Sequence, residues 1–265
     1  MGRSVAQVAA MNTPLDRARL ETSGEVELHD VLVSTQARAK EAARSGAPHG
    51  FAVFAERQEQ GRGRLGRVWE APSGAAVLVT MVLRPTMAAS QAPLLCLAAA
   101  VATVEAIEAT REVGIAPYGI KWPNDVLAPD ARKVAGILAE ADPRRDGTLA
   151  YALMGVGINV HAAPPLDSAT CLDDVEGARR DRTGLAVALM SSMRAWADRL
   201  AAAPQTVLDR WRRDQITLGR RVRIGSVAGT AVDIEPSGAL LVRDVGGTLH
   251  RITTGDVEMV GRISS

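Results

Sequence analysis

The sequence predicts an α+β fold followed by a small β-barrel. Up to about residue 217, apolar runs of strand length alternate with longer segments whose apolar residues recur at helical spacing. Beyond Gly219 the pattern changes to short runs separated by Gly and Pro-Ser-Gly turns, which is typical of a small all-β domain. We therefore expect a lead-in over residues 1–24, a main domain over residues 25–217 and a barrel over residues 218–265.

The composition argues against several classes of function. The net charge is +1 in 265 residues, whereas bulk nucleic-acid binding leaves a basic footprint. No apolar run reaches the roughly 18–20 residues that span a bilayer, and the N-terminal segment is too mixed for a good signal peptide. The two cysteines, Cys96 and Cys171, lack metal-binding spacing. The sequence does not exclude a disulfide between them, but two reduced cysteines in a cytoplasmic protein are the simpler expectation.

The first predicted elements run from a short helix to a capped helix. Asp16–Glu21 has room for one or two helical turns, and Glu25–Val33 alternates loosely, as a strand does. Ser34 or Thr35 then provides an N-cap for a helix over Gln36–Arg44. Free N–H groups and hydroxyls at such a helix start can bind a polar ligand group, although plain capping is the commoner reason for this pattern.

A basic glycine loop lies between two predicted strands, Phe51–Ala55 and Ala75–Leu83. Glycine lets the backbone approach a ligand, free N–H groups bind anions, and the arginine fork grips carboxylate or phosphate. The loop, Glu56–Trp69, therefore predicts a clamp for an anionic small molecule, with a flexible surface hairpin as the alternative. Its alternating glycines and arginines are Gly61, Arg62, Gly63, Arg64, Gly66 and Arg67.

A helix and a bent strand follow this loop. Pro93–Arg111 carries one apolar stripe at helical spacing, includes Cys96 as a small core residue, and should end at Gly114. Tyr118–Leu127 cannot pass straight through Pro123 in a sheet, so we expect a hairpin there. The residues presented around this turn are Lys121, Trp122, Asn124 and Asp125.

Two longer strands come next. Arg132–Glu140 opens with cations and contains Gly136, and a glycine within a strand often marks the close approach of a ligand. Lys133 at its start is either a ligand-binding cation or a solvated edge residue. Thr148–Val160 contains the sequence GVGIN (Gly155–Asn159), which lacks the third glycine and the following helix of a dinucleotide-binding motif.

The remaining chain predicts a loop, two helices and the barrel. Residues 161–181 are rich in Pro, Asp and Gly, which indicates a loop. Thr183 should cap a helix over Gly184–Ala203, and a second helix should cover Gln205–Gln215. About 45 further residues fit a small SH3-like barrel better than a sandwich. Its expected strands are Arg221–Ile224, Ala228–Ile234, Ala239–Arg243, Leu249–Thr253 and Val257–Val260.

Four motifs now stand in a defined order. They are GRGRLGR (Gly61–Arg67) with Trp69 after it, KWPND (Lys121–Asp125), ARKVAGILAE (Ala131–Glu140) and GVGIN. KWPND followed closely by the RK and AGIL residues is highly specific. In this order and spacing, over roughly residues 25–262, the chain resembles a bacterial biotin–protein ligase.

The resemblance implies a fold and a two-step reaction. The fold is a mixed sheet flanked by helices, of the class II aminoacyl-tRNA synthetase and biotin ligase type, with a C-terminal SH3-like barrel. Biotin's carboxylate attacks the α-phosphate of MgATP, which gives biotinyl-5′-adenylate and pyrophosphate. A lysine of a biotin carboxyl carrier domain then attacks the adenylate and releases AMP. Biotin, ATP and Mg²⁺ are thus expected, with no metal ligand assigned. The cations suit the need to bring two anions together.

The resemblance also implies roles for individual residues. Lys133 should bridge the biotin carboxylate and the α-phosphate, with Arg62 and Arg64 facing the same groups, so these three are the expected catalytic residues. Gln36 stands where the family usually has Asn, which leaves its own role open. The implied biotin-binding residues are Ser34, Thr35, Gln36, Gln58, Gly61, Arg62, Gly63, Arg64, Lys133, Gly136 and Gly155. Those implied for ATP or the adenylate are Arg64, Arg67, Trp69, Asn124, Asp125, Lys133 and Asn159.

Partners and rival functions follow from the same comparison. About 24 residues precede the first core strand, too few for the winged-helix domain that some members carry, so we expect a ligase without specific DNA binding. No membrane partner is expected, and a homodimer is left open. The nearest rival is a lipoate–protein ligase or octanoyl transferase of the same fold. A rival from another class is an inactive protein whose barrel docks peptides.

Overall fold

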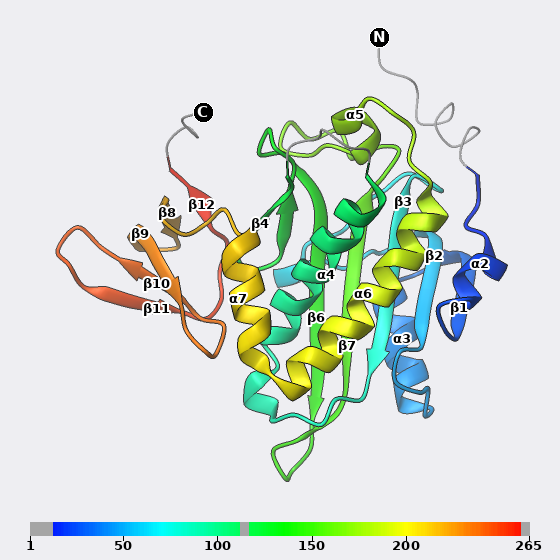
Figure 1. Cartoon of the computed structure of the whole chain (residues 1–265), viewed down its shortest axis with the longest axis horizontal. Coiled ribbons are helices and arrows are strands. Elements are labelled where there is room, and N and C mark those ends of the chain that lie inside the picture. The colour runs from blue at the N-terminus through cyan, green and yellow to red at the C-terminus, as the bar shows by residue number, and fades with distance from the viewer. Residues whose placement is uncertain (1–12, 112–116, 261–265) are drawn as a thin grey trace.

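The main domain is built on a seven-stranded mixed sheet of order β1-β2-β3-β7-β6-β5-β4 (Figure 1). The computed structural model describes residues 13–111 and 117–260. Within this sheet, β1 and β2 pair in parallel and the other described neighbours are antiparallel, which confirms the α+β class and the mixed sheet. The strands are β1 (Val26–Leu32), β2 (Ala52–Gln58), β3 (Ala76–Leu83), β4 (Gly119–Lys121), β5 (Asp125–Leu127), β6 (Lys133–Pro143) and β7 (Leu149–Asn159).

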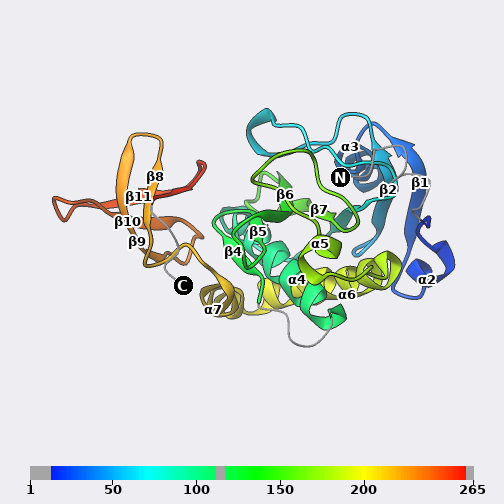
Figure 2. The same cartoon turned by 90° about the horizontal axis from the view of Figure 1, so that it is seen from above.

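Helices cover the two faces of this sheet unequally. The larger layer, α4 and α6 with α7 beside them, packs on one face, and α3 packs on the other (Figure 2). The main apolar core lies under the larger layer, and a small cluster that includes Ala39, Val53 and Tyr151 lies under α3. The helices are α2 (Arg17–Glu21), α3 (Thr35–Arg44), α4 (Leu94–Thr110), α5 (Leu172–Glu176), α6 (Arg182–Ala202) and α7 (Pro204–Asp214), with 3₁₀ turns η1 (Arg64–Gly66) and η2 (Ala89–Gln91).

The alternation of side chains along the strands decides which face can hold a ligand. Val79 and Met81 of β3 point into the main core, so Thr80 between them points to the α3 face. Thr80 pairs with Gly155 of β7, and Gly157 pairs with Gly136 of β6. A small polar residue and three glycines therefore share the α3 face, where they leave room that larger side chains would fill.

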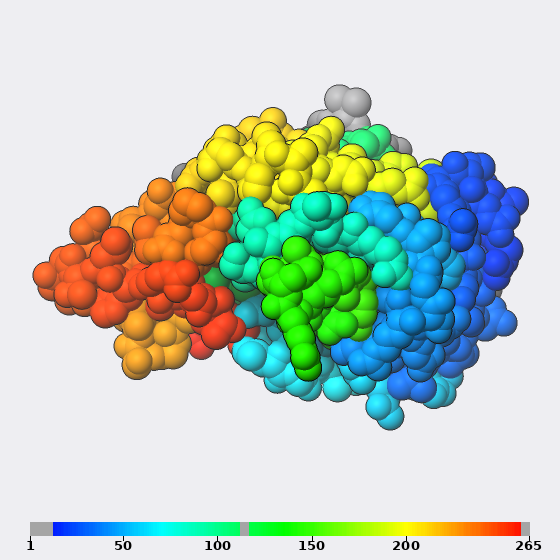
Figure 3. All heavy atoms as spheres, turned by 90° about the horizontal axis from the view of Figure 1, so that it is seen from below, coloured from blue at the N-terminus to red at the C-terminus, as the bar shows by residue number. Residues whose placement is uncertain are grey.

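The C-terminal segment forms a separate five-stranded antiparallel sheet of order β11-β10-β9-β8-β12, the SH3-like domain expected from the sequence. It stands at one end of the molecule, beside the main domain (Figure 3). Trp122 joins the two parts, because its indole N–H donates to Gly238 O at 3.1 Å. The strands are β8 (Arg221–Ile224), β9 (Val227–Ile234), β10 (Leu240–Arg243), β11 (Leu249–Ile252) and β12 (Glu258–Met259).

Two expectations about local structure are wrong. Residues 161–181 are not all loop, since α5 forms within them. Thr183 does not cap α6; Asp181 does, with its carboxylate accepting from Gly184 N at 3.0 Å, and the Thr183 hydroxyl instead accepts from Asp16 N. A carboxylate suits the positive end of the helix and displaces the hydroxyl from that position.

Other boundaries are close to those expected. The hairpin at Pro123 is confirmed, with β4 and β5 on either side of it. The helix end expected at Gly114 lies outside the described residues, as do residues 1–12 of the lead-in. The division of the chain after residue 217 stays a prediction. Within the described ranges, no helix has both the length and the hydropathy needed to cross a membrane.

Candidate active site

A polar corner forms where the parallel strands β1 and β2 end side by side. Leu32 of β1 pairs with Gln58 of β2, and α3 begins at Thr35 directly above them. The Thr35 backbone N–H and hydroxyl donate to Gln58 Oε1 at 2.8 and 3.1 Å. The Thr80 hydroxyl lies 3.0 Å from that of Thr35. Ser34 Oγ is buried with no hydrogen-bond partner among the described residues, so this corner retains polar capacity that a ligand group can use.

Gln36 fills the space beside Gly155. It is 3% exposed, and its Oε1 lies 3.2 Å from the Thr80 hydroxyl. A Cβ at Gly155 would lie 2.5 Å from this oxygen, so the glycine makes room for Gln36 itself. Gln36 Nε2 is buried with no partner among the residues described. The residue that departs from the family's usual asparagine is thus part of the pocket wall.

The basic glycine loop forms a tight antiparallel turn. Trp69 N donates to Gly61 O and Gly63 N donates to Arg67 O, each at 2.8 Å. Leu65 at its tip takes a left-handed conformation with φ of 56° and is exposed. These two backbone hydrogen bonds hold the ends of the loop together and give it a defined shape.

Two loop arginines bind the C-terminal domain. Arg64 donates to Asn124 Oδ1 at 3.1 Å and to Thr254 Oγ1 at 3.2 Å. Arg67 forms an ion pair with Asp256. The third, Arg62, is exposed and makes no side-chain hydrogen bond or ion pair within the described ranges. The loop therefore bridges the two domains while Arg62 keeps its guanidinium available.

Trp69 covers the glycines of β6 and β7. A Cβ at Gly157 would lie 2.5 Å from its Cε2, and one at Gly136 would lie 2.7 Å from its Cζ3. Lys133 Nζ lies 5.4 Å from the centre of the indole ring, within cation–π range. The glycines thus admit the indole, and the indole in turn forms a flat wall beside the lysine.

Lys133 and Asp125 form the charged centre of the site. Their Nζ and Oδ1 atoms are 2.5 Å apart, and Lys121 Nζ lies 4.0 Å from Asp125 Oδ2. The Lys133 side chain is about one-third exposed and reaches along β6 over Gly136. An anionic ligand at this point would compete with Asp125 for the ammonium.

One pocket brings together most of the residues expected from the sequence. Those that line it are Ser34, Thr35, Gln36, Gln58, Arg62, Gly63, Arg64, Arg67, Trp69, Asn124, Asp125, Lys133, Gly136 and Gly155. Two do not line it. Gly61 instead lines a neighbouring cavity, which shares several loop residues with this pocket. Asn159 is buried, and its Nδ2 donates to Thr170 O at 3.1 Å.

Some lining residues had no part in the sequence prediction. Thr80 had a weak signal, a lone hydroxyl in the apolar run of β3, and Gly157 lay within a motif already noted. No signal in the sequence indicated Asp256, because it lies 189 positions from its partner Arg67. The further lining residues are Val68, Leu78, Val79, Thr80, Ile137, Leu138, Val156, Gly157 and Asp256.

Neither cysteine suits a nucleophilic role in this pocket. Both are free, and burial raises the pKa of the Cys96 thiol and that of Cys171 to about 12. A reactive cysteine needs the thiolate, which these environments disfavour. Neither residue lines the pocket. Among the described residues, no group of three acidic, His or Cys side chains is arranged to hold a metal.

Comparison with known proteins agrees with this geometry. Residues 28–159 match the model of the "Biotin/lipoate A/B protein ligase family", and residues 217–260 match the "Biotin protein ligase C terminal domain". A "Biotin--[acetyl-CoA-carboxylase] ligase" of Mycobacterium tuberculosis is 38% identical over 84% of this chain and 85% of the relative. The chain belongs to the biotin protein ligase family. A "Bifunctional ligase/repressor BirA" of Bacillus subtilis is 34% identical over 87% of this chain and 73% of the relative.

Solved structures of biotin protein ligases share the fold. The Aquifex aeolicus biotin protein ligase in complex with biotin and ATP superposes with a TM-score of 0.69 at 25% identity, covering 88% of this chain and 97% of that one. Another structure of the Aquifex enzyme gives a TM-score of 0.71 at 22% identity, over 89% and 99%. Both domains of this biotin protein ligase family member thus have counterparts of known structure.

Proposed function

We propose that this chain activates biotin as biotinyl-5′-AMP and transfers it to a lysine of a biotin carboxyl carrier domain. The observation that carries the proposal is a single pocket lined both by the cations Lys133, Arg62 and Arg64 and by the polar residues Ser34 and Thr35. A ligand with a polar head and a carboxylate tail matches such a pocket. The Aquifex structure with biotin and ATP supports the same pair of substrates.

The polar corner accounts for recognition of the head group. Biotin's ureido ring carries two N–H donors and one carbonyl acceptor. Ser34 Oγ, with no partner among the described residues, and the Thr35 and Gln58 side chains supply both kinds of hydrogen-bonding group. Buried polar groups reject ligands that leave them unpaired, so this corner favours a urea over a dithiolane ring.

The charged centre accounts for the activation step. A carboxylate oxygen of biotin forms a bond to the α-phosphorus of ATP, and the bond to the β-phosphate breaks, so that pyrophosphate leaves with the electron pair. Lys133 would release Asp125 and neutralise both the carboxylate and the α-phosphate. Arg62 and Arg64 would add positive charge from the loop. These groups act by alignment and electrostatic stabilisation, without a covalent enzyme intermediate.

The transfer step needs less from the protein. The neutral amine of the acceptor lysine attacks the carbonyl carbon of the adenylate, AMP leaves with the electron pair of the broken C–O bond, and the new amide nitrogen loses a proton. The loop wall at Gly63 and Arg64 would hold the adenylate until the acceptor arrives. The Mycobacterium relative, named for acetyl-CoA carboxylase, supports a carboxylase carrier domain as the acceptor.

Mg²⁺ fits the donor set of the pocket. It binds oxygen ligands and is usually held by nucleotide phosphates with one or two carboxylates. Asp125 and Asp256 both line the pocket, and Asp125 is the one beside the lysine. When bound, the ion would supply charge neutralisation on the phosphates. Asp125 is the protein residue best placed to hold it.

One experiment separates this function from its rival. The protein is incubated with labelled pyrophosphate, MgATP and either biotin or lipoate, and label in ATP is counted. Exchange should require biotin. A carrier domain added with unlabelled substrates should gain one biotin by mass. Exchange that depends on lipoate, or transfer that proceeds without ATP, would contradict the proposal.

A further inference from the structure

The backbone of Lys133 is held on both sides by one segment. Lys133 N donates to Ser168 O at 2.8 Å, and Thr170 N donates to Lys133 O at 2.9 Å. Lys133 and Ala169 thus form an isolated parallel bridge at the first residue of β6. The direction in which the Lys133 side chain leaves the sheet depends on this segment, although none of residues 168–170 lines the pocket.

The segment is fixed at its far side through Asp173. Asp173 N donates to Val160 O at 2.9 Å, and its Oδ2 lies 2.9 Å from His161 Nδ1. The His161 side chain is only 4% exposed. The other carboxylate oxygen of Asp173, Oδ1, accepts from Arg180 N at 3.0 Å. The chain from residue 168 to residue 180 is therefore tied both to the end of β7 and to Arg180.

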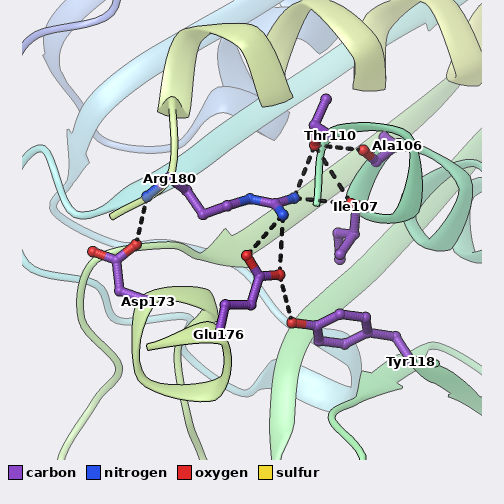
Figure 4. Close-up of polar contacts among 7 residues, drawn as sticks. All are labelled: Ala106, Ile107, Thr110, Tyr118, Asp173, Glu176 and Arg180. Atoms are coloured by element: carbon purple, nitrogen blue, oxygen red, sulfur yellow. Dashed lines mark hydrogen bonds and ion pairs between the residues drawn. The ribbon is translucent and has the colours of Figure 1, made fainter. Parts of the chain in front are cut away.

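Arg180 is the centre of a buried cluster with Glu176 and Tyr118, here called the Arg180 cluster (Figure 4). The Arg180 and Glu176 side chains are 5% and 1% exposed, and Arg180 NH1 lies 3.0 and 2.8 Å from the two carboxylate oxygens. The Tyr118 hydroxyl donates to Glu176 Oε1 at 2.9 Å. Arg180 NH2 also donates to Ile107 O at 2.9 Å and to Thr110 Oγ1 at 2.8 Å.

The cluster joins the two structural supports of the charged centre. Glu176 ends α5, just after the segment that holds Lys133. Tyr118 immediately precedes β4, and Lys121 at the other end of β4 pairs with Asp125 across the hairpin. Arg180 anchors both to the C-terminal end of α4. Lys133 is thus connected to Arg180 through the segment that ends at Glu176. Its partner Asp125 is connected to Arg180 through β4 and Tyr118.

A buried ion pair is a poor source of stability but a precise geometric constraint. The desolvation of both charges offsets much of their attraction, whereas loss of one partner leaves the other charge buried and unpaired. Burial, followed by the bond to Glu176, raises the pKa of the Tyr118 hydroxyl above its usual range, so it remains a donor at any physiological pH.

We propose that the Arg180 cluster is a positioning element that sets the place of Lys133 against Asp125. Tyr118, Glu176 and Arg180 are positioning residues, because none of them lines the pocket. This inference rests on the proposed function, in which Lys133 must reach two anions at once. A small displacement of a catalytic group lowers the rate of the chemical step more than it weakens substrate binding.

The test uses Tyr118→Phe, which removes one hydroxyl, and Glu176→Gln, which leaves Arg180 without its anion. The control is Glu105→Gln. Glu105 also lies on α4 and accepts from Ser192, Trp196 and Arg210, but on the helical side away from the pocket. Single-turnover adenylate formation and biotin affinity are measured on folded protein well below its melting temperature. Hydrogen exchange is followed at the Lys133 and Thr170 amides.

We expect both cluster variants to exchange these two amides faster and to form adenylate about tenfold more slowly, with biotin Kd changed less than about threefold. Glu105→Gln should lose stability without either effect. If the cluster variants lose only stability, or if the amides exchange faster while the rate is kept, the positioning role is wrong. The exchange measurement needs no activity, so failure of the wild-type protein to use biotin would overturn the proposed function separately.

Discussion

Lys133 Nζ lies 2.5 Å from Asp125 Oδ1, so the main cation of the pocket is already paired with a carboxylate of the protein. The side chain of Lys133 meanwhile lies over Gly136 of β6. A substrate carboxylate or phosphate that reaches Lys133 replaces one anion by another, which requires less desolvation than creating a new ion pair. Lys133 can thus exchange the Asp125 carboxylate for an anionic group of the substrate.

Replacement of Lys133 by Ala should lower the rate of biotin activation sharply. The variant loses the group that neutralises carboxylate and phosphate together, and removal of one such electrostatic contact typically lowers the rate about 10²- to 10³-fold. Biotin-dependent pyrophosphate exchange measures the effect. Lys40→Ala is the matched control, because Lys40 is paired with Glu140 and does not line the pocket. Normal exchange by Lys133→Ala would remove this lysine from the mechanism.

Asp125→Asn should separate binding from chemistry. Without the competing carboxylate, biotin should bind several-fold more tightly, since a like charge near the bound carboxylate is gone. Adenylate formation should nevertheless slow, because Lys133 loses the partner that orients it. Calorimetry with biotin gives the first quantity and single-turnover kinetics the second. An uncharged biotin amide should show no gain in affinity; an equal gain for the amide would contradict this account.

Asp256→Asn should loosen the loop. The Arg67 and Asp256 side chains are 67% and 39% exposed, so their ion pair contributes at most about 1 kcal/mol, and adenylate should escape up to about fivefold faster. Release is measured as adenylate in the filtrate after a single turnover. Asp244→Asn, which removes an acid of the same domain that pairs with His250, should have no effect. Equal release from both variants would show that the contact does not hold the loop.

Gly157→Ala should disturb the wall formed by Trp69. The new methyl would lie 2.5 Å from Cε2 of the indole, and overpacking of this kind costs about 1–3 kcal/mol. The indole must move, so we expect weaker ATP use and a smaller change in biotin affinity. Gly246→Ala, at a position where the nearest atom is 3.4 Å away, is the control. An unchanged KM for ATP would show that the indole position does not matter.

The two thiols should be inert in the native protein. With the pKa of Cys96 and that of Cys171 at about 12, roughly one thiol in 10,000 is ionised at pH 8. Iodoacetamide should therefore label them only after denaturant is added. Because these pKa values are raised in the folded state, their contribution to stability is complete below about pH 9 and is lost as the pH rises toward 12. Rapid native labelling at pH 8 would contradict this prediction.

Much of the site was predictable because its motifs are local. The glycine loop, KWPND and the start of β6 each place two or more lining residues within a few positions, and strand alternation then decides which of them face the pocket. The sheet and the C-terminal domain followed from periodicity and turn residues in the same way. Local sequence therefore contains most of the information needed for these parts.

The remainder depends on contacts that no local pattern encodes. Asp256 reaches the pocket only because the C-terminal domain packs beside the loop, and α5 forms where Glu176 is buried against Arg180. Thr183 does not cap α6 because its hydroxyl accepts from Asp16 N, far away in the chain, while Asp181 caps the helix and also pairs with Arg19. In each case tertiary packing selects among several locally acceptable arrangements.

The position of Trp69 gives the unmodified protein its own optical reporter. The chain has four tryptophans, and three of them, Trp122, Trp196 and Trp211, are at most 6% exposed and lie in the main core. Trp69 alone lines the pocket, with its ring over two glycines and the Lys133 ammonium beside it. A change in emission on adding ligand would therefore arise at the pocket wall, and its time course would follow binding directly, without a label.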